Sequence, residues 1–329
     1  MSWRQVLVAL GALVAMLFLA SLLTGPAQGA PGASLDALFS GGDGATALVM
    51  REIRLPRAIL AVLIGAGLGL SGAALQGYLR NPLAEPGLLG ISGSAALGAV
   101  IALYSGLSVA IPLALPVLAL AGAGVATLLV QGLAGAGGGS ITLILAGIAV
   151  SSLAGALTSL VLNLSPNPFA ASEIVYWMLG SLADRSMIHV ALAAPFILAG
   201  CALLLTLGRA LDALTLGEDA AASLGITLAR TRLLAVVGTA LAVGAGVAVA
   251  GAIGFVGLVV PHMLRPLVGA LPSRLLPASA IGGAALLLAA DLAVRLIAPD
   301  RDLKLGVLTA LVGAPFFLWL VWRNRRSLA

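Results

Sequence analysis

The sequence predicts an all-α polytopic membrane protein, built as a single transmembrane domain over residues 1–329. Composition is the first reason, because 61% of the residues are hydrophobic and only 9% are charged, whereas soluble domains carry about 25% charged residues. The second reason is that the apolar residues form runs long enough to cross a bilayer. The third is the 42 glycines, which suit helices that pack closely in lipid.

A spanning helix needs about 20 predominantly apolar residues. The first candidate follows Arg4 and precedes small residues at 27–30, as in a secretory signal, but its apolar run exceeds the roughly 7–15 residues of a signal core. We therefore expect an uncleaved helix there. About ten segments qualify, or nine if the closely spaced seventh and eighth are one span; they lie near residues 5–23, 58–78, 88–106, 111–132, 141–163, 187–207, 231–250, 253–268, 276–297 and 305–322.

Basic residues indicate which ends of the spans face the cytoplasm. With the N-terminus inside, ten spans leave ten of the 17 Lys and Arg residues inside, among them Arg323, Arg325 and Arg326 near the C-terminus. We therefore expect both termini in the cytoplasm. The seven outward basic residues are an anomaly, for which we expect a functional reason.

The chain lacks the residues that several functional classes require. The only lysine is Lys304, so a phosphate-binding G-x-x-x-x-G-K-[ST] loop is excluded, and any ATPase must be another chain. One cysteine, Cys201, and two histidines, His189 and His262, leave little material for a metal site. No basic tract suggests nucleic-acid binding. We therefore expect no cofactor, no metal and no nucleic acid.

Charged groups that could couple transport to an ion gradient are also scarce. Asp291 and Glu173 lie near predicted outer helix ends, and no span has a carboxylate at its centre. This disfavours a secondary carrier or channel. No paired aspartates, H-E-x-x-H motif or Ser/His couple lies at depth, which disfavours a membrane-embedded enzyme.

Glycines recur in the second span from Gly65 to Gly77 and in the seventh and eighth from Gly238 to Gly257. Small residues allow helix backbones to approach closely in lipid, which is one explanation. The other is a smooth wall along the path of a bulky solute. The two are compatible.

Five polar segments interrupt the apolar background. In the first, Pro56 fits the first turn of the second span and leaves Arg54 and Arg57 near an exposed rim, either for binding or for interfacial snorkelling. The second runs from Ser71 through Gln76 to Gly87 and contains the helix-breaking Pro82 and Pro86, with Asn81, Leu83 and Glu85 beside them.

The third segment, Leu214–Gly225, lies in the longest cytoplasmic loop, residues 208–229. Glu218 and Asp219 suit the first turn of a short helix, and Gly217 and Gly225 suit its two ends. Such a helix could dock into a partner's groove or lie on lipid.

The fourth segment runs from Gly251 to Arg265, and we expect its His262 at an inner helix end, as a carbonyl cap or partner contact. The fifth opens the last span, where Pro315 predicts a kink unless neighbours satisfy the freed carbonyl.

In this order, these segments resemble the FecCD-type permeases, the membrane subunits of binding-protein-dependent ABC importers for iron–siderophores, haem and cobalamin. The resemblance spans about residues 51–322. Its matching stretches are Arg54-Leu-Pro-Arg57, Ser71–Gly87, Trp177-Met-Leu-Gly-Ser-Leu182, Leu216-Gly-Glu218 with Leu224-Gly225, Phe255-Val-Gly-Leu with Pro261-His262, and Gly313-Ala-Pro-Phe-Phe317.

The resemblance implies two five-helix halves in each subunit and a second permease copy, as a homodimer or pseudo-dimer. It implies that a periplasmic substrate-binding protein docks on Arg54, Arg57 and Arg295. It further implies that residues 208–229 carry a coupling helix for a cytoplasmic ATP-binding subunit, and that the second segment holds a pathway and gate. The coupling residues are Gly217, Glu218, Ala221, Leu224 and Gly225, and the pathway and gate residues are Gln76, Asn81, Pro82 and Leu83.

The function implied is a bacterial inner-membrane permease without its own ATPase. It would move an iron chelate, a siderophore complex or haem, from periplasm to cytoplasm; cobalamin is the alternative, and a carrier or channel a distant one. One departure from the family pattern is Asp302-Leu-Lys304, where Glu-Leu-Pro is usual. Lys304 adds positive charge near the docking face, which could alter partner choice.

Overall fold

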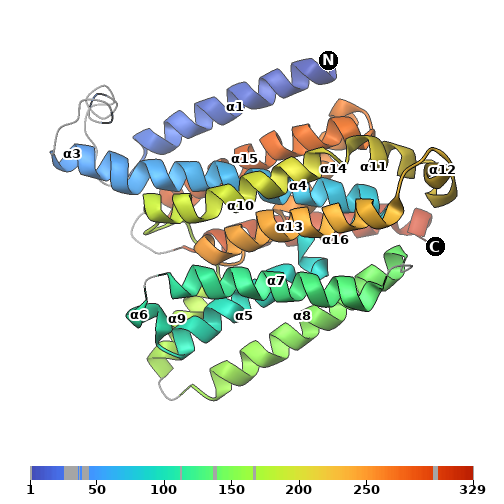
Figure 1. The fold of residues 1–329 in the computed structure, drawn as a ribbon. Helices are drawn as coiled ribbons and strands as arrows, with labels where there is room; N and C mark the ends of the chain where they lie inside the picture. The colour runs from blue at the N-terminus through green and yellow to red at the C-terminus, as the bar shows by residue number, and fades with distance from the viewer. Residues whose placement is uncertain are drawn as a thin grey trace.

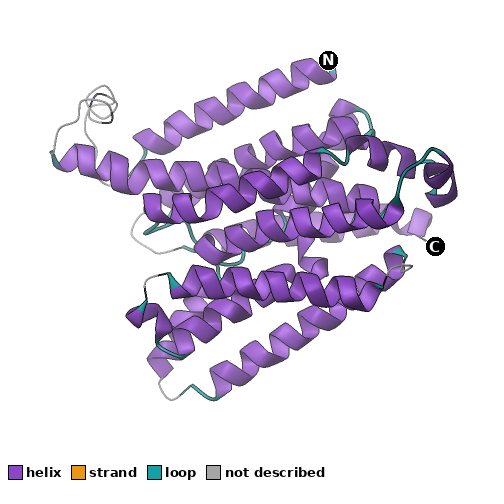
Figure 2. Ribbon diagram, viewed as in Figure 1, coloured by secondary structure: helices purple, strands orange, loops and turns teal. Residues whose placement is uncertain are grey.

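The computed structural model describes residues 2–25, 36, 38, 44–111, 113–135, 139–165, 168–298 and 303–328. Within these residues the regular structure is entirely helical (Figures 1 and 2), which confirms the predicted all-α class. Ten longer helices follow the ten predicted segments: α1 (Trp3–Leu23), α4 (Leu55–Tyr78), α5 (Ile91–Tyr104), α7 (Ala114–Ala134), α8 (Ser140–Asn163), α10 (Met187–Leu205), α13 (Leu228–Ala250), α14 (Val256–Val268), α15 (Pro272–Ile297) and α16 (Leu305–Leu328).

Two of these helices are shorter than the spans predicted for them. α5 has 14 residues and α14 has 13, against the roughly 20 that cross a bilayer. Each follows a break in the chain: the 3₁₀ helix η2 (Pro86–Leu89) leads into α5, and the non-helical residues 251–255 lead into α14. Among the described residues, seven helical stretches are long and apolar enough to cross a membrane alone.

Short helices lie at the two ends of the bundle. α3 (Ala45–Leu48) and the π-helical η1 (Val49–Arg54) continue into α4, so that one 34-residue helical stretch runs from Ala45 to Tyr78. The others are α6 (Leu107–Ala110), α9 (Pro168–Met178), α11 (Gly208–Leu214) and α12 (Glu218–Ser223).

Glycines bring α4 very close to α15 and α14. A Cβ added at Gly65 would lie 2.8 Å from the carbonyl carbon of Gly283, and one at Gly72 would overlap the backbone of Gly257. Because lipid gives helices no hydrophobic reason to associate, such close backbone contact supplies the packing energy. The packing explanation of the glycine-rich helices is thus confirmed.

The N-terminus, the C-terminus and α12 lie at one end of the bundle, and α3, α6 and α9 lie at the other (Figure 1). Both termini reach the same end because the chain crosses the bundle an even number of times. The end with α12 is called the α12 end below, and the end with α3 the α3 end.

Candidate functional site

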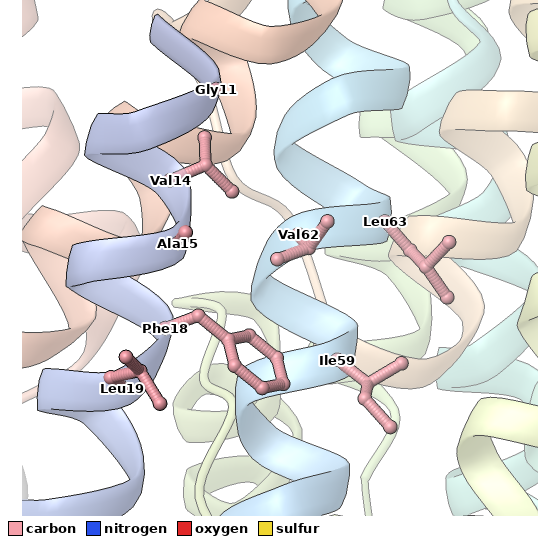
Figure 3. Close-up of a pocket in the computed structure, with 8 residues that line it drawn as sticks. All are labelled: Gly11, Val14, Ala15, Phe18, Leu19, Ile59, Val62 and Leu63. Atoms are coloured by element: carbon pink, nitrogen blue, oxygen red, sulfur yellow. The ribbon is translucent and has the colours of Figure 1, made fainter. Parts of the chain in front are cut away.

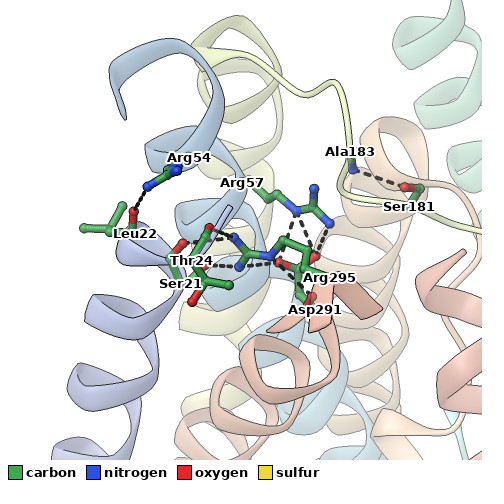
Figure 4. Close-up of polar contacts among 9 residues, drawn as sticks. All are labelled: Ser21, Leu22, Thr24, Arg54, Arg57, Ser181, Ala183, Asp291 and Arg295. Atoms are coloured by element: carbon green, nitrogen blue, oxygen red, sulfur yellow. Dashed lines mark hydrogen bonds and ion pairs between the residues drawn. The ribbon is translucent and has the colours of Figure 1, made fainter. Parts of the chain in front are cut away.

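An arginine cluster stands at the α3 end, where α4 and α15 meet the last turn of α1 (Figure 4). At its centre is Asp291, whose side chain is 0% exposed. Its carboxylate accepts hydrogen bonds from Arg57 Nε at 2.9 and 3.1 Å, and Arg57 Nη2 lies 2.9 Å from Oδ1. Arg295 Nη2 lies 2.9 Å from Oδ2. One buried carboxylate therefore pairs with two guanidinium groups.

The cluster also fastens the C-terminal turn of α1. Arg295 Nη1 donates to the carbonyl oxygens of Ser21 and Thr24, both at 2.9 Å, and Nη2 donates to Ser21 Oγ at 2.6 Å. Arg54 Nη1 donates to the carbonyl oxygen of Leu22 at 2.9 Å. The last carbonyls of a helix have no partner within the helix, so the two arginines supply donors that α1 lacks.

The expectation of an exposed rim is wrong for Arg54, which is 4% exposed. The side chains of Arg57 and Arg295 are 17% and 11% exposed. They are covered because the end of α1 lies against Arg54 and Arg295, and because Asp291 draws Arg57 and Arg295 inward. Interfacial snorkelling does not describe Arg54 either, since its guanidinium binds a protein carbonyl. The docking role of the three arginines stays a prediction.

At the α12 end, the loop 208–229 contains the predicted short helix, α12, with Glu218 and Asp219 in its first turn, and also α11, which was not predicted. Gly217 and Gly225 flank it with φ of +110° and +82°, a region that favours glycine. Ala221 is fully buried and holds the helix to the bundle, while Leu216 and Leu224 are 70% and 64% exposed. The loop therefore presents apolar side chains outward beside an acidic helix start.

Two contacts hold this loop in place, and sequence reasoning missed both. Asp212 Oδ1, on α11, accepts a hydrogen bond from the Ser273 backbone N–H at 2.9 Å and so caps the start of α15. Arg80 Nη2 lies 3.9 Å from Glu218 Oε1, with both side chains about half exposed. The latter pair links α12 to the turn after α4. No local signal could have revealed partners so distant in sequence.

The predicted gate segment forms the turn between α4 and η2. The Asn81 backbone N–H donates to the Gln76 carbonyl at 3.2 Å, and Asn81 Oδ1 accepts from the Leu83 N–H at 2.9 Å. Asn81, Pro82 and Leu83 are half-buried. The predicted break at Pro82 and Pro86 is thus present, with Pro82 in the turn and Pro86 at the start of η2.

Gln76 is 3% exposed and its side chain faces α14. Its Nε2 donates to the carbonyls of Gly257 and Leu258 at 3.4 Å, and its Oε1 accepts from Arg265 Nη2 at 2.8 Å. Within one chain Gln76 therefore joins α4 to α14. Its place on a pathway stays a prediction.

Sequence reasoning also missed the neighbours of Glu85. It lines one cavity together with Phe255, the N-cap of α14, which has φ of +67° and no side-chain cap of its own. The cavity has a volume of about 120 Å³ and is lined by Leu68, Glu85, Pro86, Gly87, Ser92, Ala252, Ile253, Gly254, Phe255 and Gly257. Residues of the break before α5 and of the break before α14 thus line the same cavity.

His262 does not lie at a helix end as expected. It lies in the middle of α14, with its ring 5.6 Å from that of Phe316 on α16 in an edge-on arrangement. The helix continues past Pro261, and the Gly257 carbonyl, which receives no donor from a proline four residues on, accepts from Gln76 Nε2 instead. Lys304 Nζ lies 5.8 Å from the Tyr176 ring, and Asp302 lies outside the described residues. Among the described residues, no group of three or more His, Cys, Asp or Glu side chains could hold a metal ion.

An apolar groove of about 530 Å³ separates α1 from α4 on the side of the bundle (Figure 3). Gly11, Val14, Ala15, Phe18 and Leu19 of α1 and Ile59, Val62 and Leu63 of α4 line it, and Phe18 points toward α4. All of its lining residues are apolar, so the groove has no side chain that could act in catalysis or bind an ion.

A bundle of membrane-crossing helices, with a cationic cluster at one end and a small partly exposed helix at the other, is the architecture of a membrane permease. The chain belongs to the FecCD transport family, whose model matches residues 13–323. It is therefore a multi-pass membrane protein of the inner membrane.

Relatives and a solved structure agree with this assignment. The chain is 40% identical to the Fe(3+) dicitrate transport system permease protein FecD of Escherichia coli, over 84% of this chain and 86% of FecD. It is 40% identical to the vitamin B12 import system permease protein BtuC of Salmonella paratyphi A, over 97% and 95% of the two chains. A metal-chelate type ABC transporter solved in an inward-facing conformation matches with a TM-score of 0.87 and 32% identity, over 97% and 99% of the two chains.

Proposed function

We propose that this chain is the permease subunit of an ABC importer that carries an iron chelate, a siderophore complex or haem, from the periplasm to the cytoplasm. ATP is hydrolysed by a separate subunit. The observation that carries the proposal is family membership over nearly the whole chain, joined to a fold with a protruding helix at one end and a basic cluster at the other.

The α12 end faces the cytoplasm in this proposal, with both termini. Arg323, Arg325 and Arg326 favour that side. The ATP-binding subunit receives α12, with Glu218 at the helix start, Ala221 as the buried anchor, and Leu224 exposed toward the partner. Gly217 and Gly225 set the angle of the helix through their positive φ.

The α3 end faces the periplasm, and the substrate-binding protein docks on the face that carries Arg54, Arg57 and Arg295. Three arginines surround one aspartate there, which leaves a surplus of positive charge for acidic groups of the partner. Complementary charge speeds encounter and sets the register of the two proteins more than it adds affinity.

Two permease copies enclose the pathway in this proposal. The turn with Asn81, Pro82 and Leu83 gates its cytoplasmic side, and Gln76 supports the gate through α14. Movement of α12 reaches this turn through Arg80, which contacts Glu218. Each partner drives transport only if it binds the two states of the permease unequally.

Cobalamin is the second candidate, favoured by one observation: the alignment with BtuC covers 97% of this chain. The test is to co-purify the chain with its periplasmic partner and measure which ligand that partner retains among ferric dicitrate, a ferric siderophore, haem and cobalamin. Retention of an iron chelate supports the proposal. Retention of cobalamin would show that the importer carries cobalamin and not an iron chelate. Transport without any ATPase would favour a secondary carrier or channel.

A further inference from the structure

We propose that Gln76 is a positioning residue, which replaces the hydrogen bond that Pro261 removes from α14 and thereby makes α14 move with α12. The contact itself follows from the fold alone. The movement rests on the proposed function, because it requires an ATP-binding subunit that displaces α12.

α14 contains a proline at a position where an α-helix uses a backbone donor. A proline has no N–H, so the Gly257 carbonyl, four residues before Pro261, loses its ordinary partner within the helix. Gly257 and Pro261 are both buried, and a buried carbonyl without a donor is unfavourable. α14 therefore needs a donor from a neighbouring helix.

The last turns of α4 supply this donor. Gly72 and Gln76 lie one turn apart on the same face of α4. Gly72 lets α14 come close, since a Cβ added there would lie 2.5 Å from the Gly257 Cα. One turn further on, Gln76 is 3% exposed, and its Nε2 donates to the carbonyls of Gly257 and Leu258, both at 3.4 Å. Gln76 thus provides what Pro261 lacks.

Arg265, one turn beyond Pro261 on α14, fixes the direction of the Gln76 amide. Its Nη2 donates to Gln76 Oε1 at 2.8 Å. A guanidinium has no acceptor, so the amide oxygen faces Arg265 and the amide N–H groups face the carbonyls. A carboxylate at position 76 would set a second acceptor against those carbonyls, and an apolar side chain would satisfy neither partner.

The contacts of Gln76 lie on both sides of Pro261. Gly257 and Leu258 precede the proline, and Arg265 follows it. Prolines are the usual places at which helices bend. Bending of α14 at Pro261 would break at least one of these contacts, so α14 is held to α4 as one unit.

The same end of α4 contacts the elements around α12. Leu211 of α11 is fully buried and packs on Gly77, where an added Cβ would lie 3.3 Å from Leu211 Cδ1. Arg80 Nη2 lies 3.9 Å from Glu218 Oε1 at the start of α12. A displacement of α12 therefore acts on the end of α4, and Gln76 carries it to α14.

The experiment replaces Gln76 by methionine, which removes both contacts at similar volume, alone and together with Pro261→Ala, which gives the helix its own donor for the Gly257 carbonyl. Gln131→Met on α7 is the matched control, because among the described residues Gln131 Nε2 has no hydrogen-bond partner. Each full-length variant is assembled in nanodiscs with the co-purified ATP-binding subunit. Hydrogen exchange of peptides from α12 and α14 is measured without nucleotide and after trapping with ATP and vanadate.

Without nucleotide, we expect Gln76→Met to speed exchange in α14 by about tenfold and Gln131→Met to leave it unchanged. Adding Pro261→Ala to Gln76→Met should restore slow exchange. Trapping should change exchange in both α12 and α14 of the wild type and the control. In the double variant the change in α12 should remain, whereas the change in α14 should shrink by about threefold or more, because α14 has regained its hydrogen bond but not its contact with α4.

The proposal is overturned if Gln76→Met leaves exchange in α14 unchanged, if Pro261→Ala does not restore it, or if trapping changes α14 equally in the double variant and the wild type. If Gln76→Met alone does not assemble, recovery of assembly by Pro261→Ala supports the contact, and no recovery overturns it. If the wild-type chain binds no ATP-binding subunit, the proposed function and the movement both fail. Exchange of the nanodisc-embedded chain without nucleotide then still decides whether Gln76 replaces the missing bond.

Discussion

The contact between α4 and α15 can be tested by adding one methyl group at Gly283. A Cβ there would lie 2.9 Å from the carbonyl carbon of Gly65 and 3.2 Å from the Cα of Gly69. Both neighbours are backbone atoms, so neither can rotate away. Ordinary contact begins at 3.4 Å, and the carbonyl oxygen of Gly65 lies closer still to the added Cβ than its carbon does, so the helices must separate by more than about 0.5 Å.

Overpacking of this kind costs about 1–3 kcal/mol. The midpoint of thermal unfolding should fall by about 2–4 °C for each kcal/mol, by analogy with soluble domains of about 150–250 residues. The matched control is Gly124→Ala on α7, where an added Cβ meets nothing within 4 Å. Since alanine favours helix over glycine, the control should be neutral or slightly stabilising.

Cys201 provides the assay. It is the only cysteine in the chain and is half-buried in α10, so a thiol-reactive fluorescent dye reports its exposure as the protein unfolds in detergent. We expect a lower midpoint for Gly283→Ala than for wild type and for Gly124→Ala. Equal midpoints for all three would refute the close contact of α4 with α15.

Three further predictions concern the connections between helices. Glu218→Ala should leave ATP hydrolysis by the assembled importer largely intact but lower uptake, because it alters the start of α12 and removes the contact with Arg80; full uptake would contradict the assigned role. Glu85→Ala should destabilise the protein by about 1 kcal/mol, because it enlarges the cavity that Glu85 lines beside Phe255, whereas Glu85→Gln keeps the volume of the side chain and should stay close to wild type in a thermal melt. Lys304→Pro should change the affinity of the substrate-binding protein, and an unchanged dissociation constant would remove Lys304 from partner choice.

Local features of the fold were predictable from the sequence. Apolar runs located the ten long helices, and Pro56, Pro82 and Pro86 located a helix start and a break. Gly217 and Gly225 located α12. These signals depend on neighbours in the chain, which the sequence displays directly.

Distant pairings were not predictable. Asp291 looked like a lone carboxylate near a helix end, and only folding brings it to Arg57, 234 positions away. The burial of Arg54 depends on where the end of α1 packs. The sequence also did not reveal that α14 is short, because an apolar run does not show at which residue the helix within it begins.

The most direct test of the central claim is accumulation of the ligand that the co-purified substrate-binding protein retains, measured in proteoliposomes. The account predicts ATP-dependent accumulation when the permease is reconstituted with its ATP-binding subunit and the loaded binding protein, and none when the chain is reconstituted alone. Accumulation against a gradient by the chain alone would contradict it.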